Sequence, residues 1–269
     1  MRLMRQTAAW YDRLATLQEG YYYPWSSQLD YWNGEDQYLS LVQRHLRSDM
    51  DVLDVACGHG DIANGIAPFC RSVLGYDRTA SWVNLAQQSA VKLGVTNVNF
   101  VCHDSSPSAN DGQARIPASN QSFDLLICSK GPFHWIEDAR RVARPGAVLL
   151  MLVPDATPVT TWHSLLPESL QWQIFSDPYW ARPAIEQRLA AIGLTIHSWW
   201  SFDVPEIFPD PEQMYTWLTW GNLVDEVASF AETRPLLERI FAEYGDAEGV
   251  AVRHRRYLWK ATVPARKVG

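Results

Sequence analysis

Hydrophobic positions follow two different periods between residues 51 and 153. Short apolar runs alternate there with longer stretches whose apolar side chains recur every three or four positions. The apolar runs predict strands over residues 51–55, 72–77, 98–102, 122–128 and 147–153. The longer stretches predict helices over residues 61–69, 80–93 and 136–143. Strands that are apolar on both faces and alternate with helices are typical of an α/β fold whose parallel sheet is covered on both sides.

The flanking segments complete this sheet. Residues 1–50 are aromatic and predicted to be helical, and residues 161–175 and 183–192 read as further helices. Two late strands are predicted over residues 194–200 and 250–263, with a helical insertion over about 211–244 between them. The sequence therefore predicts a doubly wound, mostly parallel sheet of seven strands. Its parts in chain order are residues 1–50, 51–153 and 154–269.

Candidate chemistry begins where the first strand ends. In open α/β sheets, ligands bind beyond the carboxyl ends of the strands. Gly58 and Gly60 stand there, and glycines allow a tight turn and a close approach of backbone amides to a ligand. The run Gly58–Ala63 also fits the dinucleotide pattern G-x-G-x-x-G/A. The glycines alone therefore leave a nicotinamide or flavin enzyme open.

Three acidic residues narrow the choice. Asp54, four residues before Gly58, would oppose a pyrophosphate but can pair with an ammonium group. Asp77 ends the second strand, where it can accept both hydroxyls of a ribose, although dinucleotide enzymes share this feature. Asp104, after the third strand, can accept a hydrogen bond from an exocyclic adenine amine. A ligand with an ammonium group, a ribose, an adenine and no phosphate is S-adenosylmethionine.

At this point the sequence resembles the class I S-adenosylmethionine-dependent methyltransferases of the group that acts on small molecules. Five motifs in the family's order carry the resemblance: Val52–Gly60, Gly75–Arg78, His103–Ser105, Ser122–Cys128 and Arg144–Leu150. The segment Ser129–Trp135 is similar to the corresponding part of trans-aconitate methyltransferase and its relatives. The resemblance departs from the family pattern at Ala56, where many members have glycine, and at Trp82, where many have methionine.

The resemblance implies a Rossmann-like methyltransferase fold with S-adenosyl-L-methionine as cofactor and S-adenosyl-L-homocysteine as product. It also implies an N-terminal helical lid over residues 1–50, a cofactor-binding core over residues 51–153, and a helical substrate cap at about 211–244 within residues 154–269. The implied cofactor-binding residues are Tyr11, Asp54, Ala56, Cys57, Gly58, Gly60, Asp77, Arg78, Trp82, His103, Asp104, Ser105, Ser129 and Lys130. Trp82 either stacks on the adenine or fills the core, and Tyr11 either contacts the ligands or packs on the sheet.

His134 is the candidate catalytic residue. It follows the fourth strand, near the place expected for the methyl donor, and histidine is the commonest general base. A base is needed only if the acceptor is a hydroxyl, because carboxylates and neutral amines attack as they stand. A histidine that packs or caps beside the cofactor explains the same residue, so both roles stay open.

Charge and composition restrict the partners. The net charge of −7 argues against a nucleic-acid partner, which would need clustered Lys and Arg. The four cysteines form no C-x-x-C pair, and no metal site is expected. The longest apolar run has seven residues, far short of the ~20 that span a bilayer. We expect a cytoplasmic protein, monomeric or homodimeric, that acts on a small molecule.

Other functions remain open from the sequence. An RNA methyltransferase would share the cofactor site, and an NAD-dependent oxidoreductase would use the dinucleotide-like glycines. A non-catalytic sensor would bind the cofactor without transferring its methyl group. The acceptor atom and the substrate are not determined by the sequence.

Overall fold

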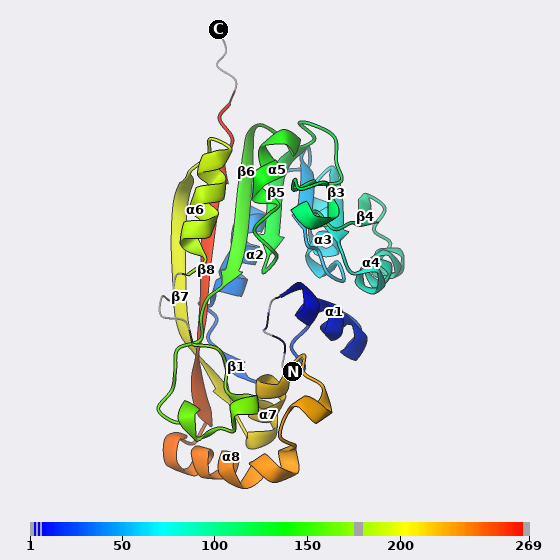
Figure 1. The fold of residues 1–269 in the computed structure, drawn as a ribbon. Helices are drawn as coiled ribbons and strands as arrows, with labels where there is room; N and C mark the ends of the chain where they lie inside the picture. Colours follow the sequence, from blue (N-terminus) through cyan, green and yellow to red (C-terminus); the bar gives the residue numbers. More distant parts are fainter. Residues whose placement is uncertain (1–2, 4, 6, 175–179, 266–269) are drawn as a thin grey trace. The chain divides into compact units, whose positions relative to one another are not determined.

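The structure is a computed structural model that describes residues 3, 5, 7–174 and 180–265 (Figure 1). Its residues fall into two compact units. Unit 1 comprises Met1–Asn33, Asp155–Pro178 and Phe202–Arg255, and unit 2 comprises Gly34–Pro154, Tyr179–Ser201 and Arg256–Gly269. Two strands, β7 (Ile196–Phe208) and β8 (Val250–Thr262), have residues in both units.

Unit 2 is built on a twisted sheet whose central strands are parallel. These strands are β2 (Asp51–Val55), β3 (Ser72–Asp77), β4 (Val98–Cys102), β5 (Phe123–Ser129) and β6 (Ala143–Pro154). The order across the sheet is β7-β8-β6-β5-β2-β3-β4, and β8 runs antiparallel to β6. Chain order reverses between β2 and β5. This reversal is the topological switch point at which doubly wound sheets open a crevice for ligands.

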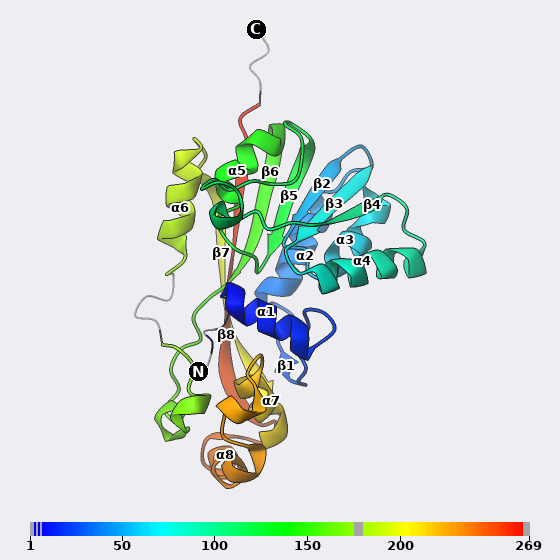
Figure 2. The ribbon, with the colours of Figure 1, turned by 45° about the vertical axis from the view of Figure 1, so that its right-hand side comes forward.

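Helices cover both faces of this sheet (Figure 2). Two of them, α5 (Ile136–Val142) and α6 (Arg182–Ala191), pack together on one face. The helices α3 (Asp61–Ile66) and α4 (Ala80–Leu93) pack together on the other face, and α2 (Gly34–His45) packs on β6. The mostly parallel, two-faced fold predicted from the sequence is thereby confirmed.

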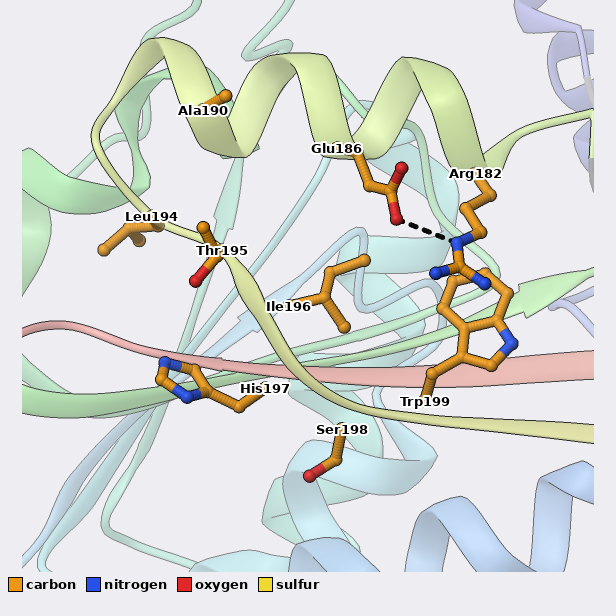
Figure 3. Close-up of a pocket in the computed structure, with 9 residues that line it drawn as sticks. All are labelled: Arg182, Glu186, Ala190, Leu194, Thr195, Ile196, His197, Ser198 and Trp199. Carbon is orange, nitrogen blue, oxygen red and sulfur yellow. Dashed lines mark hydrogen bonds and ion pairs between the residues drawn. The ribbon is translucent and has the colours of Figure 1, made fainter.

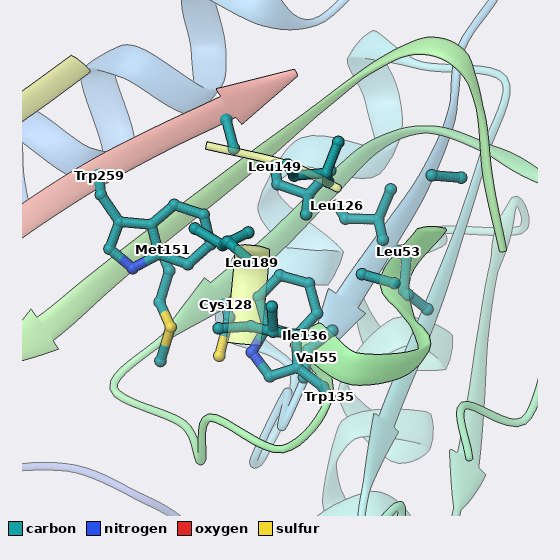
Figure 4. Close-up of a cluster of buried hydrophobic side chains, with 14 of the residues drawn as sticks. Leu53, Val55, Leu126, Cys128, Trp135, Ile136, Leu149, Met151, Leu189 and Trp259 are labelled. Atoms are coloured by element: carbon teal, nitrogen blue, oxygen red, sulfur yellow. The ribbon is translucent and has the colours of Figure 1, made fainter. Parts of the chain in front are cut away.

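The core under α5 and α6 explains why the strands read as continuous apolar runs. Alternate residues of β2, β5 and β6 point to this face, as Figure 4 shows. Trp135, just before α5, stacks on Trp259 of β8 with ring centroids 6.3 Å apart, and both side chains are fully buried. Val52, Leu125, Ile127 and Leu150 are intervening residues that are fully buried as well, so these strands carry apolar side chains on both faces.

Most predicted boundaries in unit 2 agree with the structure. Strands β2, β3 and β4 and helix α4 have the predicted bounds, and β5 begins one residue later than expected. The helix predicted over 61–69 is α3 followed by a 3-10 turn, η1 (Ala67–Phe69), because Pro68 provides no backbone donor. Strand β6 begins at Ala143, earlier than the start predicted at residue 147, and its register against β5 shifts near this end.

In unit 1, α7 (Pro211–Thr219) and α8 (Phe230–Tyr244) occupy the predicted insertion, joined by the 3-10 turn η5 (Val224–Glu226). Asp210 and Ser229 cap the two helices through their side-chain oxygens. Both helices pack in an aromatic core that contains Trp162, Trp172 and Trp217.

Three other elements complete unit 1. Helix α1 (Ala8–Leu17) precedes β1 (Gln28–Leu29), a strand of only two residues that pairs with the end of β7 and was not predicted. The helix predicted over 161–175 is wrong for its described part. Residues 161–174 form two 3-10 turns, η3 (His163–Leu165) and η4 (Glu168–Leu170), separated by Pro167, and residue 175 lies outside the described residues. None of the described helices is long and apolar enough to cross a membrane.

Candidate functional site

The turn after β2 is tight and rigid. Ala56, Gly58 and Gly60 all have positive φ, at 52°, 55° and 83°. The Cys57 amide donates to the carbonyl of Tyr76 at 3.0 Å, and the Gly58 amide donates to Asp77 Oδ2 at 2.9 Å. These bonds fix the turn on the neighbouring strand β3. The positive φ of Ala56 also gives a physical reason for the glycine that many family members have at this position.

Gly60 is constrained by packing inside unit 2, and its predicted contact with the cofactor stays a prediction. A Cβ at this position would lie 2.6 Å from Ala86 Cβ and 2.8 Å from Phe100 Cζ. These two side chains belong to α4 and β4, so the missing side chain lets the turn pack against its own fold. Gly60 therefore shapes the start of α3 through packing inside unit 2.

Asp54 is an acid placed in the core of the sheet. Its side chain is 2% exposed, and its Oδ2 has no hydrogen-bond partner among the described residues. Burial and the nearby Asp77 raise the pKa of Asp54 to about 8, while a hydrogen bond from the Ala63 backbone opposes this rise. A buried carboxyl with this raised pKa is mostly protonated at pH 7 unless a cationic group pairs with it.

Asp77 lies beside Asp54 at the end of β3 and is also buried. Its two oxygens accept the amides of Gly58 and Thr79, at 2.9 and 2.8 Å. Burial raises the pKa of Asp77, against the effect of these hydrogen bonds. Each carboxylate oxygen has two acceptor sites, so both oxygens can still accept a hydroxyl. The arrangement fits the ribose role predicted from the sequence.

The loop after β4 contains His103, Asp104 and Ser105. His103 Nε2 lies 2.7 Å from the carbonyl of Arg115, and the Ser106 amide donates to Asp104 Oδ1 at 2.9 Å. Partial burial acts to raise the pKa of Asp104, but hydrogen bonds from Ser106 outweigh it and the pKa lies below the ordinary value. Asp104 is thus an ionised acceptor at pH 7.

The segment after β5 lies directly against the β2 turn. A Cβ on Gly131 would lie 2.6 Å from Cys128 Sγ and 2.9 Å from Ala56 Cβ. Ser129 ends β5, and Lys130 follows with a positive φ of 61°. Strand ends far apart in sequence are therefore brought together at one edge of the sheet.

Lys130 and His134 make defined contacts within unit 2. Lys130 Nζ lies 3.0 Å from Glu35 Oε2, and Arg256 Nη2 lies 3.2 Å from Glu35 Oε1. His134 Nε2 lies 3.1 Å from Ser105 Oγ. No local pattern indicated a role for Glu35, because its partners are 95 and 221 residues away along the chain.

Three predicted residues remain to be placed. Arg78 follows β3 and is exposed, whereas Trp82, in the first turn of α4, is only 3% exposed. Tyr11 lies on α1 in unit 1, where its ring contacts those of Trp10 and Tyr21 at 5.0 and 5.9 Å. The roles predicted for these three side chains stay predictions.

A separate groove of about 390 Å³ lies between α6 and β7 (Figure 3). The Arg182 guanidinium lies 4.4 Å from the centre of the Trp199 ring and pairs with Glu186 at 2.8 Å. Strands β8 and β6 separate β7 from β5, and no predicted site residue lines the groove. Over the described part of the chain, no group of three or more His, Cys, Asp or Glu side chains is arranged to hold a metal ion.

The part of the chain that contains these residues matches a known protein family. A family described as "Methyltransferase domain" matches residues 52–150, which run from β2 into β6. Residues 52–150 form a class I methyltransferase domain. This methyltransferase domain contains the glycine turn, Asp54, Asp77, the loop after β4 and the segment after β5.

Relatives agree with this assignment of the methyltransferase domain. The uncharacterized methyltransferase YcgJ of Bacillus subtilis is 30% identical over 118 residues, 44% of this chain and 43% of YcgJ. A demethylmenaquinone methyltransferase of Lactiplantibacillus plantarum is 26% identical over 155 residues, 52% of this chain and 62% of that protein. The chain thus matches less than half the length of YcgJ and less than two thirds of the length of the demethylmenaquinone methyltransferase.

A solved structure shows the same fold over most of the chain. A functionally unknown protein from Deinococcus radiodurans R1 superposes with a TM-score of 0.63 at 22% identity, covering 93% of this chain and 97% of that protein. This likeness concerns the fold alone. The chemistry of the methyltransferase domain must be argued from its own residues.

Proposed function

We propose that this protein transfers the methyl group of S-adenosylmethionine to a small-molecule acceptor and releases S-adenosylhomocysteine. The observation that carries the proposal is Asp54, a buried carboxyl whose Oδ2 has no partner among the described residues. An ammonium group is the partner that would ionise such a carboxyl. A pyrophosphate would instead disfavour the ionised form of Asp54, whereas an acid at the position of Asp77 is shared with dinucleotide enzymes and does not discriminate.

The other residues of the turn fit the remainder of the same ligand. Asp77 would accept the ribose hydroxyls, and Asp104, His103 and Ser105 would face the adenine. Backbone groups of Ala56, Cys57 and Gly58 would contact the part of the cofactor that connects its ammonium group to its ribose. Arg78, Trp82, Ser129 and Lys130 complete the proposed set within unit 2, and the ligand contact of Tyr11 in unit 1 stays a prediction. When bound, the cofactor supplies an activated methyl group whose leaving group needs no proton.

The chain's own contribution is then mainly positioning. The turn is already held by hydrogen bonds to β3, so little order has to be gained when the ligand binds. Gly131 places the segment after β5 against Ala56, which narrows the space beside the turn. The rate of methyl transfer rises most when the methyl donor and the methyl acceptor are held facing each other in this way.

The acceptor is proposed to be a small molecule. The acidic net charge of −7 does not suit a polyanionic substrate such as RNA. The demethylmenaquinone methyltransferase among the relatives acts, by its name, on a small molecule. We extend that substrate class, and no particular substrate, to this chain.

A thermal-shift titration tests the cofactor assignment. S-adenosylhomocysteine at one hundred times its dissociation constant should stabilise the protein by about 2.7 kcal/mol, or roughly 5–10 °C in Tm. NAD at the same concentration should leave Tm unchanged, and adenosine serves as the matched partial ligand. Stabilisation by NAD alone would refute the proposal.

Activity is tested separately with methyl-labelled S-adenosylmethionine and a panel of small acids, amines, phenols and quinols. Label transferred to one member of the panel supports the proposed reaction. Tight binding of S-adenosylhomocysteine without transfer to any member would favour the non-catalytic sensor instead.

A further inference from the structure

Three polar side chains form a hydrogen-bonded chain across the carboxyl ends of the sheet. They are Tyr76 in β3, Ser105 after β4 and His134 between β5 and α5. The Tyr76 hydroxyl lies 3.1 Å from Ser105 Oγ, and Ser105 Oγ lies 3.1 Å from His134 Nε2. Tyr76 and Ser105 are buried, so water does not compete for these groups.

The first hydrogen bond has a defined direction. The Tyr76 hydroxyl donates to Ser105 Oγ. Burial raises the pKa of Tyr76 far above its ordinary value, so the phenol keeps its proton at every pH at which the protein is folded. With Tyr76 as the donor, Ser105 Oγ is the acceptor of this hydrogen bond.

The second hydrogen bond follows from the first. A serine hydroxyl has one proton to donate, and the lone pairs of Ser105 Oγ are partly occupied by Tyr76. Among the described residues, His134 Nε2 is the acceptor within reach of that proton. If Nε2 carried a proton of its own, the buried serine proton would lack a partner, which is costly in a site without water.

We propose that Ser105, oriented by Tyr76, donates to His134 Nε2 and holds His134 as the neutral tautomer whose proton is on Nδ1. Ser105 and Tyr76 are then positioning residues. In this tautomer Nδ1 is the hydrogen-bond donor of His134, and Nε2 accepts the proton of Ser105.

The charges around His134 are consistent with a neutral ring. Burial is the largest influence and lowers the pKa of His134. Asp104 and Glu137 act to raise that pKa, while Arg188 and Arg78 act to lower it further. These groups come from the β4 loop, α5, α6 and the end of β3, which are the elements that face the ring. The net direction is downward, so the imidazole is neutral at pH 7.

The consequence for substrate class rests on the proposed methyl transfer. Because the Ser105 hydroxyl occupies Nε2, an alcohol acceptor would have to displace Ser105, or pass its proton through Ser105, before His134 could act as its base. The site then suits a nucleophile that attacks as it stands: a neutral amine, a carboxylate, a thiolate, or a phenolate or enolate of low pKa. An Nδ1–H donor stabilises such an anion and holds it beside the methyl donor.

Long-range ¹H–¹⁵N correlation spectra of the ¹⁵N-histidine-labelled full chain test the proposal without any ligand. His134→Gln identifies the His134 signals by their loss. In the wild type we expect a protonated Nδ1 and an unprotonated Nε2 between pH 6 and pH 8. Ser105→Ala should convert the ring to the Nε2–H tautomer and raise its pKa, because a hydrogen bond to the neutral form is lost.

Matched variants separate positioning from packing. Ser105→Thr keeps the hydroxyl and should restore the Nδ1–H tautomer. Ser108→Ala removes an exposed serine of the same loop and should change nothing. Tyr76→Phe should weaken the preference without reversing it. A wild-type ring protonated on Nε2, or a tautomer unchanged in Ser105→Ala, would overturn the proposal.

These results are independent of the proposed function. Should S-adenosylhomocysteine fail to bind while the spectra show the Nδ1–H tautomer, the proposed function is lost and the hydrogen-bonded chain stands. Should the cofactor bind while the ring is the Nε2–H tautomer, the reverse holds.

Discussion

Replacing Asp54 by asparagine should make the protein more stable and at the same time impair cofactor binding. Asp54 is fully buried in β2, and its pKa rises from 3.8 to about 8. A carboxyl with a raised pKa in the folded state binds its proton more tightly there than in the unfolded chain. Folding stability is therefore lost as pH rises from about 4 to about 8.

The size of the effect follows from the shift. Each unit of pKa corresponds to ~1.4 kcal/mol, so the roughly three units between 3.8 and pH 7 correspond to about 4 kcal/mol. Asp54→Asn is neutral in both states and avoids this loss. We expect its free energy of unfolding to exceed that of the wild type by up to about 4 kcal/mol at pH 7, and by nothing at pH 4.

Binding should show the opposite preference. A ligand ammonium needs an ionised Asp54, so binding must remove the carboxyl proton. The dissociation constant of S-adenosylhomocysteine should fall about tenfold per pH unit between pH 6 and pH 7 in the wild type. Asp54→Asn should bind at least ~100-fold more weakly at pH 7.5, with an affinity that does not depend on pH.

Urea denaturation at pH 4, 7 and 8 and calorimetric titration from pH 6 to 8 measure the two effects. Asp111→Asn, the same substitution at an exposed position, is the control and should leave both unchanged. If the stability difference between wild type and Asp54→Asn is constant with pH, the buried ionisable carboxyl inferred here is wrong. A pH-independent affinity of the wild type would remove Asp54 from the ammonium site.

Three further predictions concern the same turn. Asp77→Ala should weaken the binding of S-adenosylhomocysteine, measured by calorimetry, at least ~100-fold. The two oxygens that would accept the ribose hydroxyls and the hydrogen bond from the Gly58 amide are lost together. Ala56→Gly should raise the free energy of unfolding in urea by about 0.5–1 kcal/mol, since relief of the φ of 52° exceeds the added freedom of the unfolded chain. Gly60→Ala should lower it by about 2–3 kcal/mol, because its Cβ would lie 2.6 Å from that of Ala86.

Each of these predictions has its own contrary result. Unchanged affinity in Asp77→Ala would show that the ribose lies elsewhere. A destabilised Ala56→Gly would mean that flexibility outweighs backbone strain at this position. Gly112→Ala is the control for Gly60→Ala, because Gly112 also has a positive φ, of 82°, but a Cβ there meets nothing within 4 Å. Equal losses in the two alanine variants would attribute the effect to φ and not to packing.

Local sequence determined the sheet well. The bounds of β2 and β3 were predictable because both strands are largely buried apolar runs. The edge strand β4 is more exposed, but its apolar residues lie between Asn97 and His103, and α4 ends where Gly94 follows it. The carboxylates Asp54, Asp77 and Asp104 were predictable for the same reason: strand ends of a parallel sheet meet at one edge. The apolar pattern of a buried strand, and the direction in which it runs toward its last residue, can both be read from the local sequence.

Segments held by distant contacts were less predictable. The two-residue strand β1 has no periodicity of its own and exists because β7 pairs with it. Residues 161–174 have a helical composition, but their backbone forms two 3-10 turns. The side chains of Trp162 and Trp172 pack in the core of unit 1. In both places tertiary packing outweighs local preference.

By itself, then, the sequence determined the parallel sheet and the glycine turn, and it put Asp54, Asp77 and Asp104 at or near the ends of neighbouring strands. Only the tertiary structure decided that Asp54 is buried with an open oxygen, that Gly60 is needed for packing on Ala86 and Phe100, and that Tyr76, Ser105 and His134 form one hydrogen-bonded chain. The physical reason is that a residue's type and period depend on its neighbours in the chain. Its pKa, tautomer and clashes depend on groups that only the fold brings within a few ångströms.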